Sequence, residues 1–454
     1  MKKNEEYIVE IVDNGFEGEG ITKINNFTIF VAGAIKGEKI KILITKVNKS
    51  FGYGKILEII QKSEKRNKVD CLTYKRCGGC NLRHINYKET LKIKKDIVQN
   101  LVNKNINTKI NVKNTIGMEN PFFYRNKAQY PIGINEIGKP VIGVFANRTH
   151  NIIEIQECFI QSKESEKIAK YICEFLYKNN ISVYNEETGE GLVRHIVIKH
   201  GFNSKELMCI IVLNGDKINN EDVLVRELIE KFPKIKTIVK NINRENTNVI
   251  FGKKDICIYG NGYIFDKLGD FTFKISPHSF YQINPIQTEK LYNIAQEKAQ
   301  LTGNEILFDL YCGIGTIGIF MAKKAKEVYG IEIVAQAIED AKENCKINNI
   351  LNAKYYAGDT EVILEDLIEK EKIKPDVIVV DPPRKGLDIN TIKNIKKIKS
   401  EKVIYISCNP ATLVRDLKKL EETYEIKEIQ PVDMFPFTSH VECVSVLHRK
   451  SLEK

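Results

Sequence analysis

Phe-Asp-Leu-Tyr-Cys-Gly-Ile-Gly-Thr-Ile-Gly, residues 308–318, ends an apolar strand and opens a helix, and this stretch decides the fold of the C-terminal part. Its glycines form the G-x-G-x-x-G pattern of nucleotide-binding turns. Asp309 stands at the strand end, four residues before Gly313. A carboxylate there would repel the pyrophosphate that dinucleotide enzymes bind at the helix N-terminus. It suits the cationic methionine end of S-adenosylmethionine (SAM), so the turn favours SAM over NAD.

Short apolar strands alternate with helical segments from Gln287 to the C-terminus, which predicts an α/β fold with a doubly wound, Rossmann-like parallel sheet. The expected strands are 306–310, 327–331, 354–357, 377–381 and 403–407. Ligands of such sheets bind beyond the carboxyl ends of the strands. We therefore expect the four acids at successive strand ends to gather there: Asp309, Glu332, Asp359 and Asp381. Glu332 is placed to bind ribose hydroxyls, and Asp359 to reach the adenine amino group.

The fifth of these strands runs into Ser407-Cys408-Asn409-Pro410, with a helix expected near Thr412. A helix N-terminus and neighbouring cations lower the pKa of a thiol, so we expect Cys408 to be a reactive thiolate. Carbon 5 of a pyrimidine becomes nucleophilic only after a group such as a thiolate adds at carbon 6. In Asp381-Pro382-Pro383-Arg384, Arg384 stands where enzymes that methylate exocyclic amines place an aromatic residue, which argues against an amine target.

His440 and Glu442 lie in an otherwise apolar run near the C-terminus and are candidate proton acceptors. Burial in such a run would raise the pKa of Glu442 and suit it to act as a base.

The N-terminal part has a different composition. Residues 1–60 read as short strands with glycine turns, typical of a small closed barrel of the kind that often binds nucleic acid. Residues 61–110 hold 13 basic and 4 acidic residues, which is most of the net charge of +11. This basic segment is a candidate phosphate-binding surface, with Lys62, Lys65, Arg66, Lys68, Lys75, Arg76 and Arg83 as its expected contacts.

Cys71, Cys77 and Cys80 crowd together inside the basic segment. The first ten residues are charged, so no secretory signal is visible, and no apolar run approaches the roughly 18 residues of a spanning helix. In such a chain we expect the 11 cysteines to be thiols, metal ligands or catalysts and not disulfides. Spacing alone leaves zinc and iron open for the triplet.

These motifs together resemble the RNA uracil-5-methyltransferase family, and most closely its branch with an N-terminal TRAM domain and an iron–sulfur cluster, the 23S ribosomal RNA uracil-5-methyltransferases. The resemblance covers nearly the whole chain. It is carried by the barrel, Cys71-x5-Cys77-x2-Cys80, the glycine turn, Asp381-Pro382-Pro383-Arg384, Ser407-Cys408-Asn409-Pro410 and His440-Val441-Glu442.

The resemblance implies that Cys408 is the nucleophile and Glu442 the base. It assigns SAM contacts to Gln282, Tyr311, Glu332, Asp359 and Asp381. It also implies a [4Fe–4S] cluster and supplies Cys158 as its fourth ligand, beside Cys71, Cys77 and Cys80.

Three domains are expected. Residues 1–60 form the TRAM-like β-barrel, and residues 61–270 form a central α/β, RNA-binding domain with the cluster cysteines. Part of 85–124 packs on the catalytic domain, and residues 271–454 form the SAM-dependent methyltransferase domain.

The expected reaction is methylation of carbon 5 of a specific uridine, structured or in a loop, in 23S ribosomal RNA, by a cytoplasmic monomer. One alternative is the same chemistry on transfer RNA. Another is a non-catalytic RNA-binding protein whose cluster senses oxidants, which would leave the four strand-end acids and Cys408 without a purpose. Cytosine-5 methylation is disfavoured, because those enzymes place a second cysteine after the Asp-Pro-Pro motif, where Arg384 and Lys385 stand.

Overall fold

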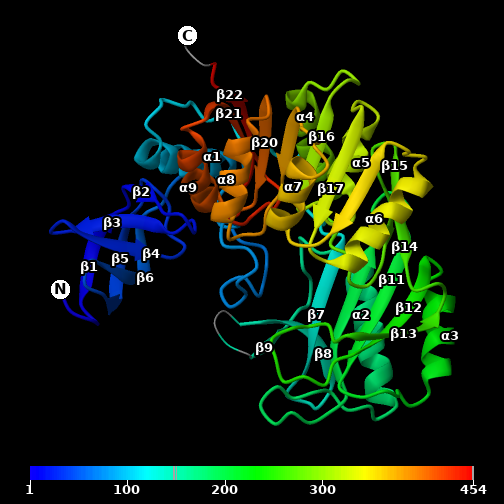
Figure 1. Ribbon diagram of the computed structural model, residues 1–454. Helices are drawn as coiled ribbons and strands as arrows, with labels where there is room; N and C mark the ends of the chain where they lie inside the picture. Colours follow the sequence, from blue (N-terminus) through cyan, green and yellow to red (C-terminus); the bar gives the residue numbers. More distant parts are fainter. Residues whose placement is uncertain (147–148, 150, 452–454) are drawn as a thin grey trace.

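A computed structural model describes residues 1–146, 149 and 151–451 of the chain. It shows an N-terminal barrel, a central mixed sheet with helices and a C-terminal doubly wound sheet (Figure 1). The expected α/β class with a small N-terminal β-barrel is confirmed. In the described part of the chain, no helix combines the length and the apolar character that crossing a membrane requires.

The N-terminal sheet has the order β1-β5-β6-β4-β3-β2. Its strands are β1 (Glu6–Glu10), β2 (Asp13–Asn14), β3 (Gly20–Ile24), β4 (Phe27–Val31), β5 (Lys39–Val47) and β6 (Phe51–Gln61). β1 and β2 are the two edge strands of this sheet, and they follow each other directly in the chain. The two edges therefore lie close together, and the sheet closes into a barrel. Ile29, Val31, Ile40, Ile42 and Ile44 fill its interior.

The cysteine-rich segment that follows contains no strand and leads into α1 (Tyr87–Asn105), which Asn86 caps by accepting from the Glu89 backbone N–H. Val98 and Val102 of α1 belong to the same apolar core as the C-terminal sheet, while Ile93 and Ile97 of the same helix pack with Ile35 of the barrel.

The central sheet has the order β13-β12-β11-β10-β7-β8-β9, in which only β11 and β12 are parallel. Its elements are β7 (Lys127–Ile134), β8 (Pro140–Phe145), β9 (Ile152–Glu154), α2 (Lys163–Lys178), β10 (Val193–His200), β11 (Leu207–Leu213), α3 (Glu221–Lys231), β12 (Ile235–Ile242) and β13 (Lys254–Tyr259). A hairpin of β14 (Ile264–Leu268) and β15 (Phe271–Ile275) follows and joins two cores, because Ile264 packs with the central sheet and Phe273 with the C-terminal one.

The C-terminal sheet has the order β18-β17-β16-β19-β20-β22-β21, and β22 alone runs against its neighbours. Its elements are α4 (Pro285–Ala299), β16 (Ile306–Leu310), α5 (Thr316–Ala322), β17 (Glu327–Glu332), α6 (Ala335–Ile347), β18 (Ala353–Ala357), α7 (Thr360–Glu369), β19 (Val377–Val380), α8 (Ile389–Ile398), β20 (Lys402–Ser407), α9 (Pro410–Leu420), β21 (Tyr424–Val432) and β22 (Glu442–Arg449).

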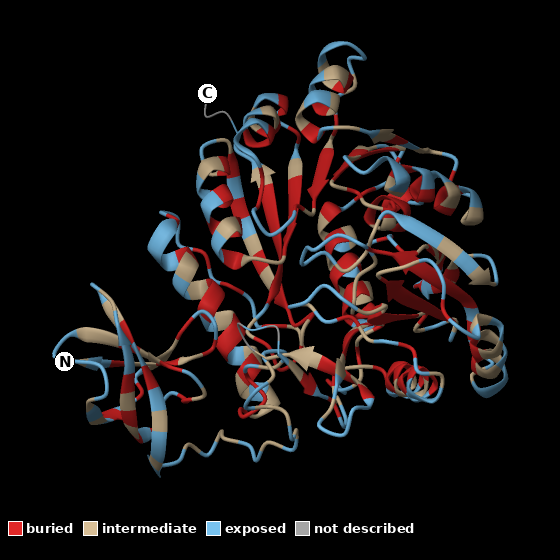
Figure 2. Cartoon of the chain, turned by 90° about the horizontal axis from the view of Figure 1, so that it is seen from below, coloured by how far each residue is buried: buried red, intermediate tan, exposed pale blue. Residues whose placement is uncertain are grey.

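Alternate residues of these buried strands pack into two different apolar cores, one on each face of the sheet. Along β19, Val377 and Val379 face α4, α5 and α6, while Ile378 and Val380 face α1, α7, α8 and α9. Figure 2 shows these buried strands in red between helices whose outer faces are pale blue. Because both faces are covered, ligands can reach the sheet only at its ends, and the parallel strands all end at the same edge.

Candidate active site

Three neighbouring strands bring Cys408, Glu442 and Asp381 to the carboxyl edge of the sheet. The antiparallel register pairs Ser407 of β20 with Cys443 of β22, so the next residue pair along the two strands is Cys408 and Glu442. Asp381 directly follows β19, the other neighbour of β20. The chain order gives no sign of this pairing, because β22 is the last strand of the sequence and inserts between β20 and β21.

The electrostatics of this trio differ in part from expectation. Glu442 is buried, and burial together with Asp381 raises its pKa to about 8, as expected for a base. Burial also raises the pKa of Asp381 to about 7. The expectation of a low pKa for the Cys408 thiol is wrong for the free protein. Burial and then the Glu442 and Asp381 carboxyls raise it to about 12, and the Arg384 cation opposes them only in part.

The helix after Cys408 begins at Pro410, two residues earlier than expected, and Asn409 caps it by accepting from the Ala411 N–H. The Asn409 amide and the Thr412 hydroxyl both donate to the carbonyl of Arg384, each at 3.2 Å. The loop that follows Asp381 is therefore fixed to the helix that follows Cys408. His440 is exposed at one side, and desolvation of its ring by the neighbouring residues, followed by the Arg384 and Lys94 cations, lowers its pKa.

Asp309 does not face a ligand as expected. Its side chain is fully buried, and its Oδ2 accepts the N–H of Gly318 at 2.7 Å inside the first turn of α5. Burial raises its pKa to about 7. Asp309 thus stabilises the glycine turn from the interior of the protein. The prediction that its carboxylate attracts a cationic ligand is wrong.

Glu332 and Tyr311 lie on either side of the glycine turn. The Glu332 carboxylate accepts the N–H groups of Gly313 at 3.2 Å and Val334 at 3.0 Å. Tyr311 has a φ of 65°, and its hydroxyl lies 3.3 Å from Thr391 Oγ1. Asp359 is exposed and caps α7 by accepting the N–H of Glu361. These three residues form a row along the ends of β16, β17 and β18.

Gln282 is held from the central domain. The Asn126 side chain, at the start of the central sheet, donates to the Gln282 carbonyl at 2.9 Å, and the Asn126 N–H donates to Ile283. The Asn284 side chain then donates to the Met434 carbonyl at 3.0 Å. The segment with Gln282 is therefore fixed on both sides.

Lys199 of β10 is a residue that the sequence did not single out. Its ammonium donates to the carbonyls of Ser276 at 2.8 Å and Ser279 at 3.0 Å, at the start of the Gln282 segment. The Ser279 hydroxyl donates in turn to Asp340 of α6 at 2.9 Å. Burial, and then the nearby Lys127, lower the pKa of Lys199 to about 7.

A second unforeseen group fixes the segment that leads to Glu442. Lys94 of α1 and Asp433 are both fully buried and form an ion pair at 2.5 Å. Asp433 also accepts from the Tyr87 hydroxyl at 2.7 Å, and Lys94 also donates to the Phe435 carbonyl at 3.1 Å. No local sequence pattern indicates this ion pair, because Lys94 and Asp433 are 339 residues apart in sequence.

The tip of the same segment meets the barrel and the cysteine-rich loop. The Asn81 side-chain amide donates to the Glu17 carbonyl of the barrel and, at 2.9 Å, to Ser439 Oγ. The Ser439 N–H donates back to the Asn81 side chain at 2.8 Å. Three parts of the chain thus converge close to His440.

The four predicted cluster cysteines are half-buried free thiols: Cys71, Cys77, Cys80 and Cys158. Burial, followed by Cys158 and Cys77, raises the pKa of Cys80 to about 12, so these thiols lie within electrostatic reach of one another. Gly79 N–H donates to Cys77 Sγ at 3.3 Å, and Thr73 Oγ1 lies 3.4 Å from Cys71 Sγ. Among the described residues no group of three or more His, Cys, Asp or Glu side chains is arranged around a single metal ion.

Not all of the basic segment is free for phosphate. Arg66 forms an ion pair at 2.6 Å with Glu38, which is fully buried in the barrel. Arg83 is buried, binds Asp70 at 2.7 Å and lies 4.5 Å from the Phe159 ring centroid. These two are structural, which corrects their expected role as RNA contacts, and Lys65 binds Glu89. The side chains of the other four are exposed and form no ion pair within the described ranges: Lys62, Lys68, Lys75 and Arg76.

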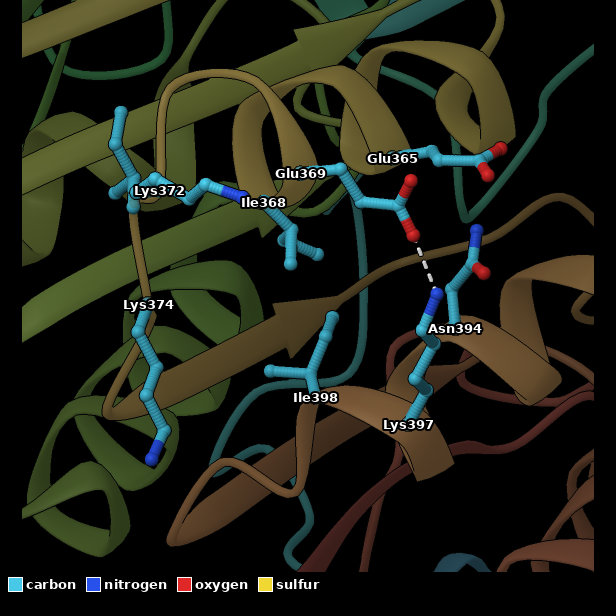
Figure 3. A pocket seen from close by; sticks show the side chains of 9 residues that line it. Glu365, Ile368, Glu369, Lys372, Lys374, Asn394, Lys397 and Ile398 are labelled. Carbon is cyan, nitrogen blue, oxygen red and sulfur yellow. Dashed lines mark hydrogen bonds and ion pairs between the residues drawn. The ribbon is translucent and has the colours of Figure 1, made fainter.

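A surface depression of about 300 Å³ lies between α7 and α8 (Figure 3). It lies beside the Glu369–Lys397 ion pair, near the end of α7. Because α7 starts at the carboxyl end of β18 and runs back along the sheet, this depression lies at the opposite edge from Cys408 and belongs to another part of the surface.

Two family models match the chain. The model described as tRNA (uracil-5-)-methyltransferase matches residues 86–450, and the TRAM domain model matches residues 2–57. The chain belongs to the tRNA (uracil-5-)-methyltransferase family. The predicted membership of the uracil-5-methyltransferases with a TRAM domain is therefore confirmed, and the chain is an RNA methyltransferase.

Full-length relatives agree with this membership. An RNA methyltransferase of Clostridium tetani is 46% identical over 448 residues, which are 98% of this chain and 97% of the relative. One from Staphylococcus aureus is 44% identical over 453 residues, or 99% of each chain. The crystal structure of the tRNA (uracil-54, C5)-methyltransferase of Pyrococcus abyssi, in complex with S-adenosyl-L-homocysteine, superposes with a TM-score of 0.77 at 27% identity. It covers 97% of this chain and 100% of the other.

Proposed function

We propose that this enzyme transfers a methyl group from SAM to carbon 5 of a uridine in RNA through a covalent bond between Cys408 and carbon 6. The observation that carries the proposal is the register of β20 and β22, which places Cys408 opposite Glu442 beside Asp381. A nucleophile and a buried base of raised pKa at one strand edge are what this addition–elimination chemistry needs.

The SAM contacts are proposed for residues at the carboxyl ends of the strands together with one residue of the loop before α4: Tyr311, Glu332, Asp359 and Asp381, and Gln282. Glu332 already accepts hydrogen bonds from the glycine turn, so it is oriented to accept more from ribose hydroxyls. When bound, SAM supplies an electrophilic methyl group.

The residues of the chain do the remaining chemistry. The uridine is turned out of its stack so that carbon 6 reaches Cys408. The Cys408 thiol releases its proton to solvent and the sulfur bonds to carbon 6. The electron pair of the carbon 5–carbon 6 double bond moves to carbon 5, which takes the methyl group. The Glu442 carboxylate then removes the carbon 5 proton, the carbon 5–carbon 6 double bond re-forms, and the bond to Cys408 breaks.

Two variants test this proposal. Cys408→Ala should abolish methyl transfer from labelled SAM to RNA. Glu442→Gln should accumulate a protein–RNA adduct that survives denaturing electrophoresis, because methylation proceeds while release of Cys408 does not. Cys257→Ala, which removes an exposed cysteine of β13, is the matched control and should behave as the native enzyme. Methylation at the native rate by Cys408→Ala would refute the covalent route.

For the substrate, we propose a uridine of 23S ribosomal RNA, which would place the enzyme in the cytoplasm. The support for ribosomal RNA is that a TRAM barrel combined with four cysteines of this spacing resembles the 23S ribosomal RNA branch of the family. Transfer RNA is the second candidate, because the matching family model and the Pyrococcus relative are both described as acting on it. Mass spectrometry of both RNAs from a deletion strain should show 5-methyluridine lost from 23S ribosomal RNA. Loss from transfer RNA alone would favour the second candidate.

A [4Fe–4S] cluster on Cys71, Cys77, Cys80 and Cys158 is the last part of the proposal. Four free thiols converge there, and hydrogen bonds to two of the sulfurs are of the kind that tune such clusters. Each thiolate of a cluster binds a different iron, so the thiols need not surround one ion. Purification without oxygen should give a brown protein with iron and sulfide, and Cys77→Ser should lose the colour. Stoichiometric zinc in place of iron would overturn it.

A further inference from the structure

Three aromatic side chains gather on the outer surface of the N-terminal barrel. The rings of Phe30, Phe51 and Tyr53 lie with their centroids 5.6 to 6.0 Å apart. Tyr53 is 38% exposed, and the two phenylalanines are half-buried. The barrel core consists of aliphatic residues and does not include these rings.

The sequence of β6 explains why the rings face outward. In Phe51-Gly52-Tyr53-Gly54 the aromatic residues alternate with glycines, and the glycines face the interior, where both are buried. A Cβ on Gly52 would lie 2.9 Å from Ile29 Cδ1. Close packing of the interior thus requires glycine, and the period of two along a strand places both rings on the outer surface.

Phe30 joins them from the neighbouring strand, since it pairs directly with Tyr53 in the register of β4 and β6. Lysines surround the three rings. Lys46 pairs with Tyr53, Lys23 of β3 pairs with Thr28 beside Phe51, and Lys55 follows Tyr53 on the same face. None of these three lysines is in an ion pair with the parts of the chain that the structure describes.

The aromatic patch, Phe30, Phe51 and Tyr53, lies on the same barrel as the turn that contacts the segment leading to Glu442. The turn before β3 contacts that segment, because the Glu17 carbonyl accepts from Asn81, which also binds Ser439. Ile21 near the start of β3 pairs with Phe30 of β4, which pairs with Tyr53 of β6. Tyr53 therefore lies two strand spacings, or roughly 10 Å, from Ile21.

We infer that the aromatic patch stacks unpaired bases of the RNA strand that extends from the target uridine, while Lys23, Lys46 and Lys55 bind its phosphates. Aromatic rings between cations are the composition that binds single strands without reading sequence. The cations identify the occupant, because an apolar surface between lysines complements bases on a polyanionic backbone. This inference rests on the proposed RNA methylation and adds a second RNA contact in another domain.

The chain contains no tryptophan, so one substitution creates a unique fluorescent reporter. In the full-length protein, Tyr53→Trp should be quenched when an oligouridine of about 12 nucleotides, within the range of site sizes of such barrels, is added. Ile8→Trp, at a 60% exposed position of β1, is the matched control and should not be quenched. An unquenched Tyr53→Trp at oligouridine concentrations that saturate binding would overturn the inference.

Affinity gives an independent measure. Phe30→Leu/Tyr53→Leu keeps an apolar surface but removes two rings, and it should weaken oligouridine binding about 10-fold or more without changing the salt dependence. Lys23→Ala/Lys46→Ala should instead reduce the log–log salt slope by about 1.4. Unchanged affinity in the leucine variant, with an unchanged melting temperature, would also overturn the inference.

The two proposals fail separately. If oligouridine quenches Tyr53→Trp but Cys408→Ala still methylates RNA, the aromatic patch stands and the covalent mechanism falls. If methyl transfer depends on Cys408 while the ring variants bind as the native protein, the aromatic patch falls and the mechanism stands.

Discussion

Glu442, the proposed base, has a pKa that depends strongly on its surroundings. Burial and the neighbouring Asp381 raise its pKa to about 8, and the pKa of Cys408 beside it is higher, at about 12. The pair therefore loses its first proton near the lower value, and the carboxylate is the form that acts as a base.

We expect kcat/KM for methyl transfer to rise with pH and to level off above about 8, since the active form is the deprotonated one. Rates measured between about pH 6 and about pH 9 test this. His440→Ala is the control and should keep the profile, because the rise is assigned to Glu442, whereas the pKa of His440 is shifted the other way, below 6.5. A flat profile would contradict the assignment of Glu442.

The raised pKa of Asp309 predicts that the free energy of unfolding depends on pH. Its pKa in the folded protein is about 7, raised by burial from 3.8, so the folded state binds its proton more tightly than the unfolded state does. Its contribution is fully present below the unfolded value and is lost as pH rises through about 7. Asp309→Asn keeps an oxygen for the Gly318 N–H and removes this loss.

The free energy of unfolding of Asp309→Asn, relative to native protein, should therefore improve by on the order of 2–4 kcal/mol between about pH 5 and about pH 8. Urea unfolding at both pH values measures it. Asp270→Asn, in the exposed turn between β14 and β15, should show no such change. An equal difference at both pH values would show that Asp309 titrates normally.

Among the secondary-structure elements, α1 has the most consequential contact. Its Lys94 forms the buried ion pair with Asp433, at the start of the segment that ends in Glu442. Removing one member of a buried pair leaves the other charge without compensation, whereas removing both charges together costs less.

Lys94→Met should lower the free energy of unfolding by about 3–5 kcal/mol and reduce kcat, because the segment before Glu442 loses its anchor. Lys94→Met/Asp433→Asn should recover part of both, since asparagine still accepts from the Tyr87 hydroxyl. Urea unfolding and single-turnover methylation measure these effects, with Lys92→Met, an exposed lysine of the same helix, as control. If the double variant is no better than the single one, charge compensation is not what holds the segment.

At the scale of the whole molecule, the barrel, the cysteine-rich loop and the catalytic sheet meet at Asn81, and the basic segment runs through this junction. Its cations divide into those that bind other parts of the chain and those that face solvent. Only the second kind can release counterions when RNA binds.

Lys75→Ala/Arg76→Ala should weaken RNA binding and flatten its log–log salt slope by about 1 to 1.5, with SAM affinity unchanged. Arg66→Ala should act differently, because it leaves the buried Glu38 without a partner and so destabilises the contact between barrel and loop. Binding titrations at several salt concentrations and thermal unfolding separate the two. An intact slope in the double variant would mean that RNA is held elsewhere.

The sequence by itself determined the C-terminal sheet and the kinds of groups at its edge. Buried parallel strands are short apolar runs, and polar residues such as Glu332 and Asp381 stand where each run ends, so local pattern was enough to place them. The expected strands 306–310, 327–331 and 403–407 lie within one residue of the observed ones for the same reason.

Tertiary structure alone decided which of these groups lie together. The insertion of β22 beside β20 pairs Cys408 with Glu442, and the pairing of Lys94 with Asp433 joins residues 339 apart in sequence. The high pKa of the Cys408 thiol and the internal role of Asp309 also arise there, because both depend on burial and on charges brought from distant segments. Local pattern specifies which side chain stands at a strand end, whereas solvation and charge are set by the whole fold.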